Sequence, residues 1–416
     1  MAKIKENLVN IKTSSTLEIN ELSVKLENEG KEIYKFGLGQ SPFPVPDVVI
    51  KELQKNAFQK NYLNVSGLLE LREHIAKYHT NKNKYNYEAD DILIGPGSKE
   101  LIFQTQLTID CEILLPSPSW VTYEPQAQII KNKIHWLETT FEQNWHVTAK
   151  ELDDKCKKIK DKTKLLILNS PNNPSGTMHT NLKELALIAK SHEVIIIADE
   201  IYADLSFNDN YESITHFYPE GTIVSSGISK WCGAGGWRLG FLLFPKNLKL
   251  IRNVIRNIAS ETFTSVSAPI QYAVIKAYSE DHSEYLQYSR KILHSISNYV
   301  HKKFNEVGIR CKKPQGGFYM LCDFSSVLEQ TNEINDSKSL CNKVLNETGF
   351  AMLPGVDFGI SVEKLITRIA FVDFDGKIVL EKALQTKFID EKFIINNCPK
   401  IVQGIKKLID WVKQQK

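Results

Sequence analysis

The middle of the chain alternates short, nearly continuous apolar runs with amphipathic segments, and this alternation restricts the fold more than any other feature. Segments 66–79 and 181–193 have helical periodicity, and Ser66 is expected to cap the first of them. Runs without a polar face are typical of strands that helices cover on both sides. The predicted strands are DILIGPG (91–97), EILLPSPS (112–119), KLLILN (164–169), VIIIADE (194–200), TIVSSGIS (222–229) and RLGFLLF (238–244). The pattern predicts an open, largely parallel α/β sheet.

After about residue 280 the sequence changes character. A long helical segment, 283–308, precedes two runs that we expect to be antiparallel strands, 316–324 and 366–374, and a helix ends the chain. A chain of 416 residues is long enough to form more than one core. We therefore predict two domains, which are a large α/β domain over 41–285 and a small α+β domain formed by 1–40 together with 286–416.

Composition argues against several classes of protein. The 52 basic and 49 acidic residues leave a net charge of +3, and the lysine-rich stretches contain acids, so no nucleic-acid partner is expected. No apolar run reaches the roughly 18–20 residues of a membrane span, and the N-terminus lacks the apolar core of a signal peptide, so no membrane partner is expected either. The seven cysteines are scattered without a CxxC pair, which predicts reduced, buried thiols in a cytoplasmic protein and no metal site.

The most informative local feature surrounds Lys230, within SSGISKWCGAGGWRLG (225–240). The lysine follows a strand-like run, a glycine-rich turn comes next, and Arg238 lies further downstream. A lysine amine at the end of a sheet can bind an aldehyde cofactor as an imine, and a guanidinium can hold a phosphate through two hydrogen bonds. Cys232, two residues after the lysine, is expected to be a small residue that the turn tolerates.

Further polar residues follow other predicted strands, and open α/β sheets bind their ligands at this edge. Gly97, Ser98 and Lys99 precede a helix, whose first backbone N–H groups can bind an anion. The P-loop pattern GxxxxGK[ST] is absent, and an ordinary strand–turn–helix is the alternative. Trp120 can stack on a planar cofactor or belong to the core, and Asn173 lies in the turn after its strand.

Asp199 ends an apolar strand, where a carboxylate is costly unless it meets a cation. A pyridinium N–H is one such partner, and a structural ion pair with Arg238 is the alternative. Tyr202, three residues later, can donate a hydrogen bond to a phenolate oxygen of the same ring. Both side chains are therefore candidates for contact with a pyridine cofactor.

As an ordered set, these motifs resemble those of the class I/II, fold-type I aminotransferases, which use pyridoxal 5′-phosphate (PLP). The resemblance covers nearly the whole chain, from GLGQSPFPVP (37–46) to LITRIAFVDF (365–374), and includes GSKE, PSPSWVTY, NSPNNPSG, ADEIYADL, SGISKWCGAGGWRLG and LPGVDFG. By this resemblance Lys230 forms the Schiff base and moves a proton, and Asp199 pairs with the pyridine nitrogen. Tyr202 and Asn173 bind the ring hydroxyl oxygen, and Trp120 stacks on the ring. The residues implied to hold the phosphate are Gly97, Ser98, Lys99, Ser229 and Arg238.

The resemblance also implies the substrate site and a homodimer. Arg368 matches the arginine that binds the substrate α-carboxylate, and Gly39 and Asn173 belong to the same subsite. Tyr62, in YLNVSG, matches a tyrosine that reaches the phosphate of the neighbouring subunit, so shared active sites are expected. Two features depart from the family. Gly227 stands where a phosphate-binding serine is frequent, and no second arginine for a side-chain carboxylate is identifiable.

The expected activity is amino-group transfer from an α-amino acid to a 2-oxo acid by a ping-pong mechanism. A PLP-dependent carbon–sulfur β-lyase is the main alternative, because it shares the fold and nearly the same cofactor contacts. A PLP-binding sensor domain of a regulator is a weaker alternative. It needs a helix-turn-helix extension, and about 36 residues precede the first matching motif.

Overall fold

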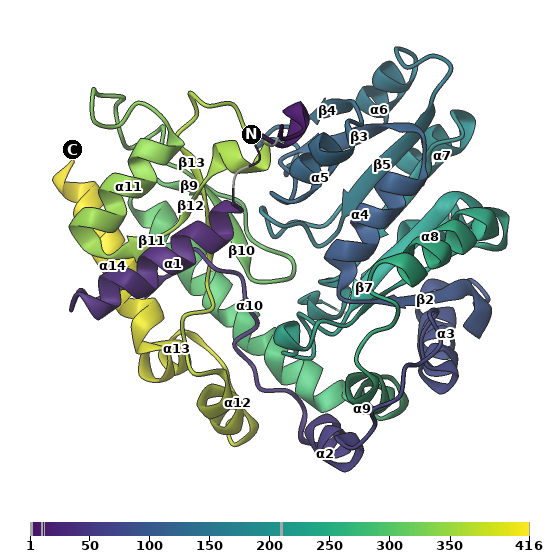
Figure 1. The fold of residues 1–416 in the computed structure, drawn as a ribbon. Helices are drawn as coiled ribbons and strands as arrows, with labels where there is room; N and C mark the ends of the chain where they lie inside the picture. Colours follow the sequence, from purple (N-terminus) through teal and green to yellow (C-terminus); the bar gives the residue numbers. More distant parts are fainter. Residues whose placement is uncertain (1–2, 10, 12, 209–210, 416) are drawn as a thin grey trace.

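A computed structural model describes residues 3–9, 11, 13–208 and 211–415 of the chain (Figure 1). Its helices are α1 (Ser15–Asn28), α2 (Asp47–Asn56), α3 (Leu69–Asn83), α4 (Ser98–Thr108), α5 (Tyr123–Ile130), α6 (Ala149–Cys156), α7 (Leu182–Ser191), α8 (Lys249–Glu261), α9 (Ala268–Ser279), α10 (Ser283–Glu306), α11 (Ser337–Thr348), α12 (Gly376–Leu384), α13 (Glu391–Asn397) and α14 (Pro399–Gln414). Its strands are β1 (Tyr34–Lys35), β2 (Ile92–Gly95), β3 (Cys111–Ser117), β4 (Ile134–Glu138), β5 (Thr163–Asn169), β6 (Ile195–Asp199), β7 (Thr222–Gly227), β8 (Gly240–Leu243), β9 (Arg310–Cys311), β10 (Tyr319–Asp323), β11 (Phe350–Ala351), β12 (Leu353–Pro354) and β13 (Ile366–Ala370).

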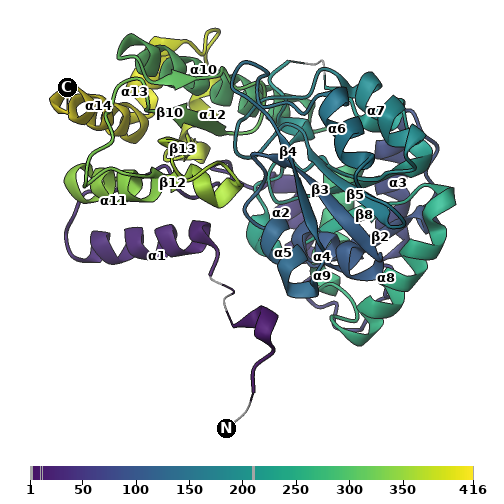
Figure 2. The same ribbon diagram turned by 90° about the horizontal axis from the view of Figure 1, so that it is seen from above.

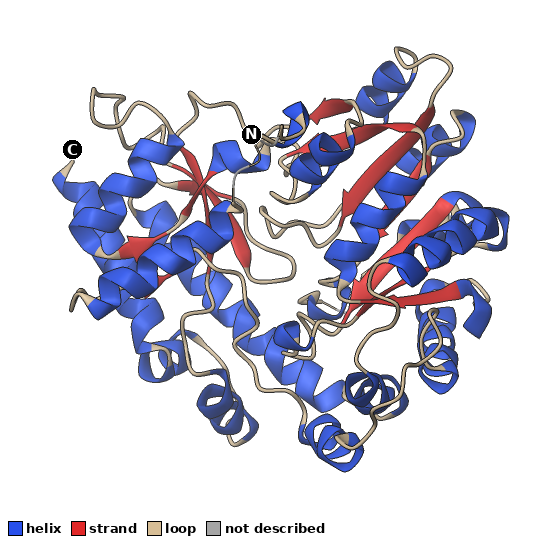
Figure 3. Cartoon of the chain, in the orientation of Figure 1, coloured by secondary structure: helices blue, strands red, loops and turns tan. Residues whose placement is uncertain are grey.

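A seven-stranded sheet in the order β2-β8-β7-β6-β5-β3-β4 forms the larger part of the molecule (Figure 3). β8 is antiparallel to both of its neighbours, and the remaining pairings are parallel. Each strand predicted in the middle of the chain is present, so the α/β fold class is confirmed. The sequence did not reveal β4, because this edge strand has a single fully buried residue, Leu137, and no continuous apolar run.

Helices cover both faces of this sheet, as the apolar strands require (Figure 2). Successive residues of a strand point to opposite faces. Leu165 and Ile167 of β5 therefore pack in one core with residues of α4 and α5, while Leu166 and Leu168 pack in another with residues of α6 and α7. A strand that must fill two cores has no position for a polar side chain until it ends, and this confines the chemistry to the sheet edge.

A second, four-stranded antiparallel sheet has the order β12-β13-β10-β9. The expected antiparallel pairing of 316–324 with 366–374 is confirmed, since Tyr319 pairs with Ala370 and Asp323 with Ile366. The N-terminal segment joins this part through β1, which pairs in parallel with β11. α10 runs without a break across the predicted domain boundary at 285/286, from the large sheet towards the smaller one (Figure 1). The boundaries themselves stay a prediction.

The expected cap at Ser66 is wrong. α3 begins at Leu69, with Leu68 as its N-cap and no side-chain cap hydrogen bond. Ser66 serves the sheet instead, because its carbonyl accepts from the backbone N–H of Ile94 and its hydroxyl from Arg252. The prediction of buried thiols holds, since all seven cysteines are buried and unpaired. Within the described residues, helices of the length and apolarity needed to cross a membrane are absent.

Candidate active site

A cavity of about 400 Å³ opens at the carboxyl edge of the large sheet and is closed from the other side by β10, β13 and the start of α1. It gathers side chains that lie far apart in the sequence. Nearly every residue predicted to act on a cofactor or substrate lines it: Gly39, Ser98, Lys99, Trp120, Asn173, Asp199, Tyr202, Ser229, Lys230, Arg238 and Arg368. Arg238 precedes β8, but this strand runs antiparallel, so its first residues lie at the same edge as the ends of the other strands.

Asp199 is the last residue of β6, and Lys230 lies in the turn that follows the neighbouring strand β7. The Lys230 amine donates to the carbonyl of Gly39 at 2.7 Å. Asp199 is only 2% exposed, and burial raises its pKa to about 6. Hydrogen bonds from the Tyr123 hydroxyl, at 2.6 Å, and from the backbone N–H of Ile201, at 3.3 Å, oppose this rise. The ion pair with Arg238 that the sequence left open is not among the contacts of the described residues.

Three cations approach one another in the cavity. Burial lowers the pKa of Lys99, and the charges of Arg238 and Lys230 lower it further. The Lys99 ammonium lies 5.2 Å from the centre of the Trp120 ring. Arg238 is held by the carbonyls of Gly235 and Pro96, at 2.9 and 3.2 Å. Cations that repel one another in this way, next to the first N–H groups of α4, form a site for an anion.

The glycines of this region explain one departure from the family. A Cβ at Gly97 would lie 2.3 Å from Nη2 of Arg238, so a side chain there would occupy the guanidinium's place. Gly97 does not line the cavity itself but allows Arg238 to do so. A Cβ at Gly227 would lie 2.8 Å from the carbonyl oxygen of Leu239 in the backbone beside it. The close approach of this segment therefore excludes a serine at Gly227, and Ser229 supplies the hydroxyl in the cavity.

Arg368 lies on the opposite wall, on β13, and is 1% exposed. Its guanidinium donates to Asn173 Oδ1 at 3.3 Å and to the carbonyl of Gly37. Its Nε has no hydrogen-bond partner among the described residues, and burial lowers its pKa without a carboxylate beside it. A buried guanidinium with donors to spare in a cavity is suited to an anionic ligand.

Tyr62 is the predicted site residue that lies elsewhere, because its side chain is 88% exposed and does not line the cavity. The cavity also contains Tyr123, which lies in PSPSWVTY with Trp120, where an aromatic ring can stack on a cofactor or belong to the core. The sequence reasoning missed Asn169, the first residue of NSPNNPSG, as well as Tyr319 and the hydroxyl residues Ser14 and Thr16, which carried no signal. Asn169 bridges two strand ends, since it donates to the carbonyl of Asp199 and accepts from the backbone N–H of Asn173.

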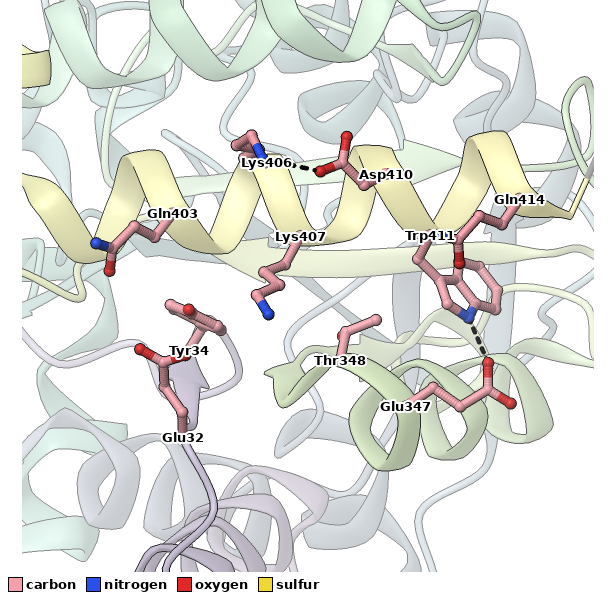
Figure 4. Close-up of a pocket in the computed structure, with 10 residues that line it drawn as sticks. All are labelled: Glu32, Tyr34, Glu347, Thr348, Gln403, Lys406, Lys407, Asp410, Trp411 and Gln414. Atoms are coloured by element: carbon pink, nitrogen blue, oxygen red, sulfur yellow. Dashed lines mark hydrogen bonds and ion pairs between the residues drawn. The ribbon is translucent and has the colours of Figure 1, made fainter.

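A second hollow, of about 580 Å³, lies between α14, the end of α11 and β1 (Figure 4). None of the predicted site residues line it. Its side chains largely bind one another, because Lys406 pairs with Asp410 at 3.2 Å and Trp411 Nε1 donates to Glu347 at 2.6 Å. The reactive groups are therefore concentrated in the cavity at the sheet edge.

Comparison with known proteins agrees with this geometry. The family model described as aminotransferase class I and II matches residues 31–375. The chain is 31% identical over 374 residues to an aspartate aminotransferase of Bacillus sp. (strain YM-2), covering 86% of this chain and 93% of that protein. It is 27% identical over 384 residues to an aspartate aminotransferase of Thermotoga maritima, covering 87% and 96%.

Solved structures show the same fold at lower identity. The aspartate aminotransferase of Thermus thermophilus with maleate has a TM-score of 0.83 at 24% identity and covers 92% of this chain and 98% of its own. That of Rhizobium meliloti has a TM-score of 0.86 at 20% identity and covers 99% of each chain. These structures have the fold-type I architecture. The chain therefore belongs to the class I and II aminotransferase family, and it is an enzyme that transfers amino groups.

Proposed function

We propose that this aminotransferase uses PLP and binds it covalently through Lys230. One observation carries the proposal: Lys230, the buried Asp199 and the cations Lys99 and Arg238 meet in one cavity. The donor set fits the cofactor, with an amine for its aldehyde, a buried carboxylate for its ring nitrogen and two cations for its phosphate. When bound, PLP supplies an electron-withdrawing ring that stabilises negative charge at the substrate Cα.

The surrounding residues are assigned to the parts of the cofactor by their chemistry. Asp199 keeps a proton on the ring nitrogen, and Tyr202 and Asn173 bind the ring hydroxyl oxygen. Trp120 covers the ring face. We assign the phosphate to residues at the start of α4 and in the turn between β7 and β8 that contains Lys230, namely Gly97, Ser98, Lys99, Ser229 and Arg238.

On the substrate side, we assign the α-carboxylate to Arg368, Asn173 and the backbone of Gly39. Arg368 supports this assignment because it is buried and has unused donors. The Lys230 amine, once released from the cofactor, would be the base that moves the proton from the substrate Cα to C4′ of the cofactor, and it would move a proton in the opposite direction in the second half-reaction. An amino acid enters first, its oxo acid leaves, and a 2-oxo acid then accepts the amino group, which gives ping-pong kinetics.

We propose aspartate as the amino donor, because similar proteins bear the name aspartate aminotransferase. The arginines among the described residues of the cavity are Arg238 and Arg368, and both already have an assignment. The hydroxyls of Ser14 and Thr16, at the start of α1, are among the polar groups of the cavity that have no assignment, and we propose them for the side-chain carboxylate. The names of these relatives do not favour the carbon–sulfur lyase alternative.

We further propose a homodimer with shared sites, in the cytoplasm. The exposure of Tyr62 supports a role in a neighbouring subunit, and the unpaired cysteines support a reducing compartment. Mixing Tyr62→Ala, if inactive, with Lys230→Ala tests the dimer. One of the two sites in each hybrid then carries both lesions and the other carries neither, so activity should partly return. No recovery in hybrids verified by native mass spectrometry would remove Tyr62 from a shared site.

Absorbance of the purified protein titrated with PLP, before and after addition of each amino acid, tests the proposed function. Aspartate should convert the bound cofactor to its amine form, and 2-oxoglutarate should restore it. Lys230→Ala should abolish both changes, whereas Lys246→Ala, at an exposed lysine paired with Glu88, should leave them intact. Pyruvate and ammonia from cystathionine, without the amine form, would instead support the lyase.

A further inference from the structure

Tyr319 stands between the two halves of the cavity and has no role in the assignments above. It is the first residue of β10, is 2% exposed and lines the cavity. Its hydroxyl lies 2.9 Å from that of Tyr202 and donates to the carbonyl of Gly39 at 3.4 Å. Its ring centre lies 4.6 Å from Cζ of Arg368. A single side chain thus contacts a group assigned to the cofactor and two assigned to the substrate carboxylate.

The packing around Tyr319 leaves it little freedom. A Cβ at Gly39 would lie 1.9 Å from the Tyr319 hydroxyl oxygen, so the hydroxyl occupies space that any side chain at Gly39 would fill. A Cβ at Gly176 would lie 2.3 Å from the Tyr319 carbonyl oxygen. The rings of Tyr202 and Tyr319 meet edge to face, with centres 5.5 Å apart. The position of Tyr319 is therefore fixed by both parts of the molecule.

We propose that Tyr319 is a positioning residue that aligns Tyr202 with Arg368. This inference rests on the proposed function, because Tyr202 and Arg368 are assigned there to cofactor and substrate. Each hydroxyl has one proton. The Tyr319 proton can be directed either to the Gly39 carbonyl, at 3.4 Å, or to the Tyr202 hydroxyl, at the shorter distance of 2.9 Å, and in the second arrangement the proton of Tyr202 remains available for the ring hydroxyl oxygen of the cofactor. The face of the Tyr319 ring contacts the buried guanidinium of Arg368, and this cation–π interaction replaces part of the hydration that the guanidinium loses on burial.

The two contacts are separable by substitution. Tyr319→Phe removes the hydroxyl and keeps the ring, so kcat should fall roughly three- to tenfold while KM for the amino donor stays within about twofold. Tyr319→Leu removes the ring as well, so the Kd of maleate, a dicarboxylate that cannot react, should rise roughly tenfold or more. Maleate binding is followed by the absorbance of bound PLP and needs no turnover. Tyr299→Phe, at a buried tyrosine of α10 outside the cavity, is the matched control.

A double-mutant cycle between Tyr319→Phe and Tyr202→Phe completes the test. In the apoprotein, the double variant should lose less melting temperature than the sum of the single losses, because either change breaks the same hydrogen bond. Additive losses, or an unchanged kcat in Tyr319→Phe together with an unchanged maleate Kd in Tyr319→Leu, would overturn the proposal. If the wild-type protein showed no transamination, the proposed function would be refuted. The mutant cycle in the apoprotein would still decide separately whether Tyr319 and Tyr202 are coupled.

Discussion

The hydrogen bond from Tyr123 to Asp199 provides the sharpest test of the site's electrostatics. The Tyr123 hydroxyl lies 2.6 Å from Asp199 Oδ2, and both side chains are buried. Burial raises the pKa of Tyr123 well above its ordinary value, so the hydroxyl keeps its proton and donates it. Tyr123→Phe removes this donor and leaves the backbone N–H of Ile201 as the remaining hydrogen-bond donor to the carboxylate among the described residues.

The size of the effect follows from the charge on the acceptor. A hydrogen bond to a charged group is worth roughly 1.5–3 kcal/mol, and one pKa unit corresponds to about 1.4 kcal/mol. The pKa of Asp199, which burial raises to about 6, should therefore rise by a further ~1–2 units in Tyr123→Phe. Solvent screening does not reduce this figure much, because Asp199 is 2% exposed.

This shift has a defined sign in the stability of the apoprotein. The unfolded chain loses the Asp199 proton near pH ~4, but the folded protein keeps it to about pH 6, so stability falls as pH rises through this window. In Tyr123→Phe the fall should continue to pH ~7–8. The variant's deficit in unfolding free energy should thus grow by roughly 1.5–3 kcal/mol between pH 5 and pH 8.

Urea unfolding of the apoprotein at pH 5 and pH 8 measures this difference. Tyr299→Phe serves as the control, and its deficit should be the same at both pH values because this tyrosine is remote from Asp199. A Tyr123→Phe deficit that does not change with pH would show that the hydroxyl does not stabilise the ionised carboxylate, and the reasoning would fail.

Three further predictions concern other parts of the structure. Arg368→Lys should raise KM for every amino donor alike, by roughly ten- to a hundredfold, because lysine cannot form the two parallel hydrogen bonds that a guanidinium forms with a carboxylate. An increase in KM confined to acidic donors would instead show that Arg368 binds the substrate side chain. Burial lowers the pKa of His179 to about 3, so its stabilising effect is complete above pH ~6.5 and is lost as pH falls. His179→Phe should reduce the loss of unfolding free energy between pH 7 and pH 5 by about 2 kcal/mol, and parallel pH curves would contradict this. Gly97→Ala should weaken PLP retention more than tenfold, because the new Cβ would displace Arg238. Gly30→Ala is the control, since Gly30 has a similar positive φ but no atom within 4 Å of the added Cβ, and this variant should retain PLP. Equal PLP retention in the two variants would show that a side chain at Gly97 does not displace Arg238.

The sequence predicts the large sheet well because its strands are buried on both faces. The runs 165–168 of β5 and 195–198 of β6 are entirely apolar, and each ends abruptly in a polar residue, Asn169 or Asp199. The same constraint that reveals such a strand also marks its last residue as part of a ligand edge. β4 lacks this constraint, since it lies at the edge of the sheet, and its sequence gives no comparable signal.

The wall of the cavity opposite the large sheet is harder to predict, because its residues lie far along the chain from the residues that they contact. Tyr319 lies in an apolar run after a glycine pair, and from the sequence alone an aromatic residue in such a run is expected to belong to the hydrophobic core. Its contacts with Tyr202 and Gly39 arise only because β10 and the segment after β1 that contains Gly39 lie at the same cavity as Tyr202, which follows β6 of the large sheet. Ser14 and Thr16 are small hydroxyl residues at the start of a helix, where residues of this kind are preferred for capping and so indicate no binding site. Residues that position the catalytic groups thus leave little trace in the local sequence, because the function they serve exists only after the two parts of the chain have folded together.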